Sequence, residues 1–250
     1  MVKIENTNIL LYICIIIKNK MIKLPKTKFI GIFDINTLIK SNHSLTVQAL
    51  TSALYNNSKH VNLFSVELIK KYEGLPIKNV VNIVSKILNL DTKTEQYLFK
   101  KTNENLYSFS KNIKFCTIDK QFISVLPLLK SLNLKYSIVS SNFENEITYN
   151  ICDNFHKQGF FPDFVAENNI TENKDEISSI KKFYRVSNKD VLFKVCSNSY
   201  DIKSLMYSNV IPIGYSQQVD QKLDFYKNGA YYVYSNHHIL KDILITENNN

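Results

Sequence analysis

The chain has 250 residues, which is enough for one α/β domain or one domain with a smaller insert, but not for three cores. A composition of 44% hydrophobic and 21% charged residues excludes a largely disordered protein. The net charge of +9 comes from lysines spread along the chain, so the sequence does not favour a nucleic-acid partner. An AT-rich coding sequence explains this charge without any ligand, and a phosphorylated metabolite is the alternative.

Residues 1–25 are expected to form an extension outside the fold. Within them, residues 8–17 (NILLYICIII) are strongly apolar but too few for the ~20 residues that a helix needs to cross a bilayer. A signal-type region, a membrane-surface anchor and an upstream start with Met21 as the working initiator are the alternatives. The sequence therefore predicts no transmembrane span.

The first element of the fold is a strand. Residues 28–34 (KFIGIFD) are almost continuously apolar and end at a charged residue, which is typical of a strand buried on both faces. Residues 44–110 then carry apolar side chains at helical spacing in four stretches, with turn-forming residues between them. We expect an all-helical block after the first strand.

The rest of the chain alternates between helices and strands, which indicates parallel strands joined by crossovers. The expected helices are 122–133, 144–158, 174–186, 199–209 and 237–245, and the expected strands are 135–140, 161–168, 190–196 and 210–216. The sequence thus predicts an α/β protein with a doubly wound, mainly parallel sheet, interrupted after its first strand by a helical insert.

The cysteines and histidines show no metal-ligand spacing. The cysteines are far apart and are expected to be buried, reduced thiols of a cytoplasmic protein, at positions Cys14, Cys116, Cys152 and Cys196. His237 and His238 are adjacent near the C-terminus, where a solvated helix start is the simplest interpretation.

Four short motifs follow one another along the chain. They are FDINTL at 33–38, YSIVSSN at 136–142, NKDEI at 173–177 and VCSNSYDI at 195–202. Their order, together with the helical insert after the first, resembles the haloacid dehalogenase-like hydrolases. The likeness is to the phosphoglycolate phosphatase and β-phosphoglucomutase branch, and it covers roughly residues 28–245.

The resemblance implies a domain organisation. A Rossmann-like core would comprise residues 26–40 and 113–250, and a helical cap would comprise residues 41–112. The cap would close over the site and select the substrate. Cap residues Glu73 and Gly74 would approach the pocket.

The resemblance also implies a set of site residues. Asp34 matches the nucleophile that forms an aspartyl phosphate, which divides a difficult hydrolysis into two displacements. Ser141, Asn142 and Lys174 match the residues that hold the phosphate, with Ser141 supplying a hydroxyl and Lys174 a cation. Taken singly, Asp34 could be an ordinary strand-end residue, and a helix N-cap and a surface lysine are the simpler interpretations of Ser141 and Lys174. Their order along the chain favours the functional interpretation.

Two positions depart from the family pattern. Asn36 stands where most family phosphatases have a second aspartate, and an amide cannot exchange a proton at neutral pH. Ser197 stands where a direct magnesium ligand is usual, leaving Asp34 and Asp201 with Ser197 or Asn198 as neutral donors. Because Mg²⁺ prefers carboxylate oxygens in strict octahedral geometry, we expect it to bind weakly or not at all.

These residues lead to three hypotheses. The first is a phosphohydrolase of a small phosphorylated metabolite that acts through an aspartyl phosphate. The second is a catalytically inactive relative that binds a phosphorylated ligand or a protein partner. Hydrolysis of a carbon–halogen bond ranks last, because the arginine expected near the first motif is missing. The sequence does not determine the oligomeric state.

Overall fold

A computed structural model describes residues 28–40, 44–57, 63–72, 75–140, 143–166 and 176–249. The expected extension, with its apolar stretch and Met21, lies outside these ranges, as do Cys14, Glu73 and Gly74. No helix within the described ranges is long and apolar enough to cross a membrane.

The centre of the molecule is a six-stranded, all-parallel sheet with the strand order β3-β2-β1-β4-β5-β6. The strands are β1 (Phe29–Asp34), β2 (Leu134–Val139), β3 (Phe164–Val165), β4 (Val191–Cys196), β5 (Ile211–Tyr215) and β6 (Tyr232–Tyr234). The chain leaves β1 towards β2 on one side and later returns to β4 on the other. This confirms the doubly wound sheet and places the topological switch point between β1 and β4.

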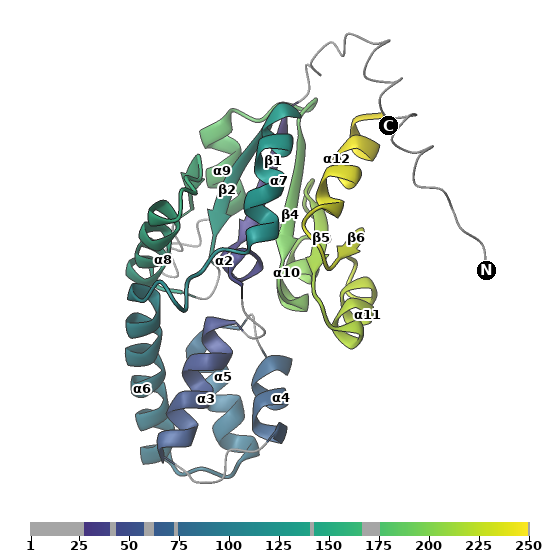
Figure 1. The fold of residues 1–250 in the computed structure, drawn as a ribbon. Helices are drawn as coiled ribbons and strands as arrows, with labels where there is room; N and C mark the ends of the chain where they lie inside the picture. The colour runs from purple at the N-terminus through teal and green to yellow at the C-terminus, as the bar shows by residue number, and fades with distance from the viewer. Residues whose placement is uncertain are drawn as a thin grey trace, which may run out of the picture.

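Helices cover both faces of the sheet (Figure 1). They are α7 (Lys120–Ser131), α8 (Asn145–Lys157), α9 (Glu176–Tyr184), α10 (Ser199–Ser204), α11 (Val219–Lys227) and α12 (Ile239–Asn249), while the short helix α2 (Ile35–Leu38) directly follows β1 at the end of the sheet. Side chains alternate along β1, so Phe29 and Phe33 pack in the apolar cluster that includes α7 and α12, whereas Ile30 and Ile32 pack with α9, α10 and α11.

The helical block expected after the first strand is present as four helices at the end of the sheet where α2 follows β1 (Figure 1). They are α3 (Leu45–Asn57), α4 (Leu63–Lys71), α5 (Ile77–Ile87) and α6 (Thr92–Lys111). Leu50 of α3 and Leu106 of α6 belong to the same buried cluster as Phe33 of β1. The block and the sheet therefore share a continuous apolar core. The boundaries of a separate cap at 41–112 stay a prediction.

Several elements differ from the sequence-based expectation. Helix α11 and strand β6 were not predicted, because α11 buries only Phe225 and β6 has three residues, so neither gives a clear apolar period. The interpretation of His237 as solvated was wrong: its side chain is fully buried, and only His238 is exposed. His237 is buried because its ring packs between Phe122 and Tyr215.

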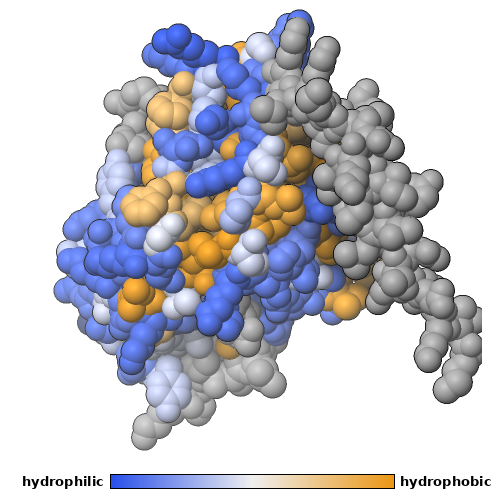
Figure 2. All heavy atoms as spheres, turned by 45° about the horizontal axis from the view of Figure 1, so that its top comes forward, coloured by the Kyte–Doolittle hydropathy of each residue, from blue (hydrophilic) through white to orange (hydrophobic). Residues whose placement is uncertain are grey.

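Apolar side chains also reach the surface. Figure 2 shows them among polar residues on the side of the molecule away from α3–α6. Exposed large apolar residues are common on folded proteins and need no special explanation. The three described cysteines, Cys116, Cys152 and Cys196, are buried and unpaired, as expected.

Candidate active site at the carboxyl ends of β1 and β4

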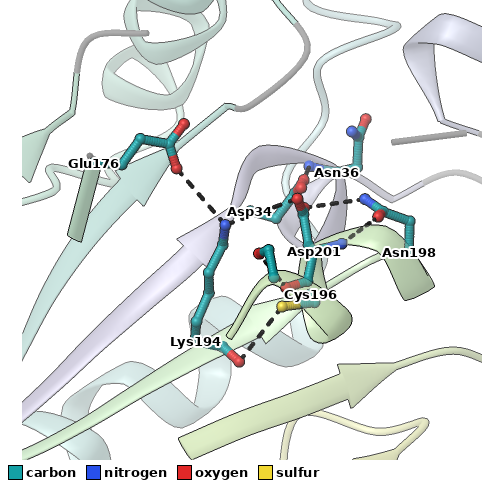
Figure 3. A network of polar contacts seen from close by, with 8 residues as sticks. Asp34, Asn36, Glu176, Lys194, Cys196, Asn198 and Asp201 are labelled. Atoms are coloured by element: carbon teal, nitrogen blue, oxygen red, sulfur yellow. Dashed lines mark hydrogen bonds and ion pairs between the residues drawn. The ribbon is translucent and has the colours of Figure 1, made fainter. Parts of the chain in front are cut away.

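The candidate site lies where β1 and β4 end side by side. Asp34 is the last residue of β1, and Cys196 is the last residue of β4, its neighbour in the sheet. Ligands of doubly wound proteins bind in the crevice at such a switch point. Figure 3 shows that Asp34, Asn36, Asn198 and Asp201 are grouped there.

The backbone fixes the position of Asp34. Its side chain caps α2 by accepting a hydrogen bond from the Asn36 N–H at 2.7 Å, and its carbonyl oxygen accepts one from Thr37 Oγ1 at 2.7 Å. The residue is only 1% exposed. A short helix after the strand therefore fixes a buried carboxyl group at the strand tip.

Asn198 and Asp201 form a reciprocal pair at the start of α10. Asn198 Oδ1 accepts from the Asp201 N–H at 2.9 Å, and Asn198 Nδ2 donates to Asp201 Oδ2 at 3.0 Å. Both residues are buried. Both polar atoms of the Asn198 amide are thus hydrogen-bonded to Asp201, and the NH₂ group rather than the oxygen faces the carboxylate.

Lys194 is a site residue that the sequence reasoning missed. It lies within β4 opposite Ile32, two residues before the strand end, or roughly 7 Å along the strand. Its Nζ lies 3.6 Å from Glu176 Oε2 and 4.0 Å from Asp201 Oδ1, and the side chain is 4% exposed. The available signal was a single lysine in an otherwise apolar strand, VLFKVC, because lysine is almost never fully buried without a partner.

The electrostatics of the site follow from burial and these neighbours. Burial raises the pKa of Asp34 well above its usual value, and the Asp201 carboxylate raises it further, whereas Lys194 and the Asn36 N–H act in the opposite direction. Burial alone would lower the pKa of Lys194, but nearby negative groups, Asp201 foremost, hold it above its usual value. Lys194 is therefore charged, and it is the described cation that favours ionised Asp34.

The remaining predicted residues fall into two groups. Ser141, Asn142 and Lys174 lie outside the described residues, so their phosphate-binding roles stay predictions. Asn36 Oδ1 and Ser197 Oγ are buried and have no hydrogen-bond partner among the described residues. Buried polar atoms of this kind are uncommon, and a ligand or a water at the site would satisfy them.

The described residues do not fit a magnesium ion. Among them, no group of three or more His, Cys, Asp or Glu is placed to hold a metal. The amide of Asn198 is already hydrogen-bonded to Asp201. The oxygen atoms that could still bind a metal ion are those of Asp34, Asp201 and the Ser197 hydroxyl. The Lys194 ammonium already faces the carboxylate that would have to bind the ion. Mg²⁺ requires near-octahedral oxygen ligands and gains little from a site that already contains a positive charge.

The parallel, doubly wound sheet, the helical block after its first strand and the carboxylate at the switch point define a Rossmann-like α/β protein with an acidic strand-tip site. The sequence model of one family, described as haloacid dehalogenase-like hydrolase, matches residues 31–210. The chain therefore belongs to the haloacid dehalogenase-like hydrolases. Members of this family generally use Mg²⁺.

Solved structures share the fold at low sequence identity. A phosphonoacetaldehyde hydrolase-like protein from Oleispira antarctica gives a TM-score of 0.70 at 10% identity, over 92% of this chain and 96% of that chain. β-Phosphoglucomutase from Clostridium difficile gives a TM-score of 0.61 at 16% identity, over 87% of this chain and 95% of that chain. A predicted phosphatase from Clostridium acetobutylicum gives a TM-score of 0.65 at 15% identity, over 88% of this chain and 100% of that chain. No curated protein sequence gives a match.

Proposed function

We propose that the protein hydrolyses a small phosphorylated metabolite through attack of Asp34 on phosphorus, at a low rate. The observation that carries this proposal is the buried Asp34 carboxylate at the switch point, fixed as the cap of α2 and accompanied by the Lys194 cation. Membership of the hydrolase family and the phosphatases among its structural neighbours support it.

In this reaction an oxygen of Asp34 forms a bond to phosphorus while the ester P–O bond breaks and the alcohol leaves. Water then attacks the aspartyl phosphate, which releases phosphate and restores the carboxylate. Asn36 cannot protonate the leaving oxygen or activate the water, so solvent has to supply and remove these protons. The loss of positioned acid–base catalysis is worth a factor of roughly 10²–10⁴ in rate.

Ser141, Asn142 and Lys174 are proposed to hold the phosphate, since Ser141 and Asn142 follow β2 and Lys174 precedes α9, in the order of the family motifs. A cytoplasmic location is proposed from the scattered cysteines, of which the three described ones are unpaired.

The test is hydrolysis of a generic phosphomonoester and a panel of sugar and glycolate phosphates by wild type and Asp34→Asn, each with MgCl₂ and with EDTA. Turnover that disappears in Asp34→Asn supports the proposal, whatever its dependence on metal. Equal background rates for the two proteins would overturn it.

A second candidate, an inactive relative that binds a phosphorylated ligand or a protein partner, is favoured by Asn36 and Ser197, which replace the acid–base and metal carboxylates. For this candidate, inorganic phosphate would raise the Tm of the wild type without any turnover. The same rise in Lys174→Ala would place the phosphate elsewhere and contradict the proposed phosphate site.

A further inference from the structure

Lys194 has a position that the four sequence motifs do not explain. It extends from the middle of β4 towards the strand tips, on the same face of the sheet as Ile32 and Cys196. Figure 3 shows its Nζ between Glu176 on one side and Asp34 and Asp201 on the other. A buried lysine is costly to place, so this arrangement has to be compensated by the surrounding carboxylates.

The charges around Lys194 correspond to those that a metal ion would balance. Asp34 and Asp201 come from separate elements, the end of β1 and the first turn of α10, and both are buried. Two carboxylates so placed repel each other unless a cation or a shared proton lies between them. Nζ of Lys194 lies 4.0 Å from Asp201 Oδ1 and 3.6 Å from Oε2 of Glu176, which belongs to α9.

We propose that the Lys194 ammonium is the permanent cation of this site and supplies the charge that a divalent ion supplies in metal-dependent relatives. The protein then folds and keeps its carboxylates together without Mg²⁺. This inference does not depend on catalysis, because it concerns the charge balance of the site with or without turnover.

The direct test is calorimetric titration of the wild type with MgCl₂ and MnCl₂, without substrate and again in the presence of inorganic phosphate. Thermal unfolding in MgCl₂ and in EDTA accompanies it. We expect no saturable binding and the same Tm in both solutions. Saturable one-to-one binding that is lost in Asp201→Asn would overturn the inference.

The complementary test removes the ammonium while keeping much of the side-chain volume, with Lys194→Met. The vacated cluster should now respond to a divalent ion, so MgCl₂ or MnCl₂ should raise the Tm of Lys194→Met but not that of the wild type. Lys203→Met, which removes an exposed lysine from α10, is the matched control and should show no response.

A folded Lys194→Met protein whose Tm is indifferent to both ions would contradict the inference. If Lys194→Met does not fold in either solution, the calorimetric titration of the wild type tests the inference. Lys194→Arg, which keeps the positive charge, should then be as insensitive to metal as the wild type. Failure of the proposed hydrolysis is recognised separately, as absent turnover, and leaves the metal titration unaffected.

Discussion

The ammonium of Lys194 and the carboxylate of Asp201 face each other beside the carboxyl end of β4, with 4.0 Å between Nζ and Oδ1. Both side chains are buried, at 4% and 9% exposure. The attraction within a buried ion pair is roughly equal to the free energy lost when its two charges are desolvated. Removing one partner nevertheless leaves an uncompensated buried charge. The pair is therefore a sensitive point of both the fold and the site.

The first prediction concerns this pair. Lys194→Met should lower the free energy of unfolding by about 3–5 kcal/mol in urea, because Asp201 and Glu176 lose their common cation. Asp201→Asn in the same chain should recover part of that loss, since one of the uncompensated charges is then gone. Lys203→Met should stay within about 0.5 kcal/mol of the wild type. Strictly additive effects of the two changes would contradict a coupled pair.

The second prediction restores the missing acid–base group. Asn36→Asp should raise phosphomonoester turnover by roughly 10²–10⁴-fold, because a carboxyl group two residues after Asp34 can protonate the leaving oxygen. Steady-state kinetics with the best substrate of the panel measures the effect. Asn36→Ala, which offers no proton, is the control, and an Asn36→Asp rate equal to that of the control would argue against a nucleophilic Asp34.

The third prediction is that Asp34 lowers the stability of the folded protein at neutral pH. Its pKa is raised above the ordinary value of 3.8, so above that pH the folded protein binds more protons than the unfolded chain and loses stability as the pH rises. Asp34→Asn should therefore unfold at a higher Tm than the wild type at pH 7, by about 2–4 °C for each kcal/mol gained. The advantage should shrink towards pH 4, and a lower Tm for Asp34→Asn at pH 7 would refute the sign.

The fourth prediction concerns His237. Its Nε2 lies 3.1 Å from the Thr37 carbonyl oxygen, which can only accept, so Nε2 carries the proton and Nδ1 accepts from Tyr234 Oη at 3.2 Å. Burial lowers the pKa of His237 from 6.5 to about 4. The unfolded chain takes up a proton first, so stability is full above pH 6.5 and falls by about 3 kcal/mol between pH 6.5 and 4.

Urea unfolding across that interval measures the effect. His237→Gln should show a shallower loss than the wild type, whereas His238→Gln, at the exposed neighbouring position, should lose stability as the wild type does. Parallel pH profiles for wild type and His237→Gln would show that another group is responsible.

The first strand was predictable because an unbroken apolar run ending in Asp34 is typical of a central parallel strand. Helices α3 to α6 were predictable because their apolar residues recur at the helical period over at least two turns. Helix α11 was not, since a polar helix that buries one side chain leaves no such pattern.

The sequence by itself determined the class of fold and the candidate positions of Asp34, Asn36, Ser197 and Asp201, because motif order and apolar period are local properties of the chain. Only the tertiary structure decided that Lys194 joins these residues and that His237 is buried against Thr37. The physical reason is that a buried charge or ring depends on groups from other elements. Glu176 and Asp201 lie on two helices, and Thr37 is 200 residues from His237.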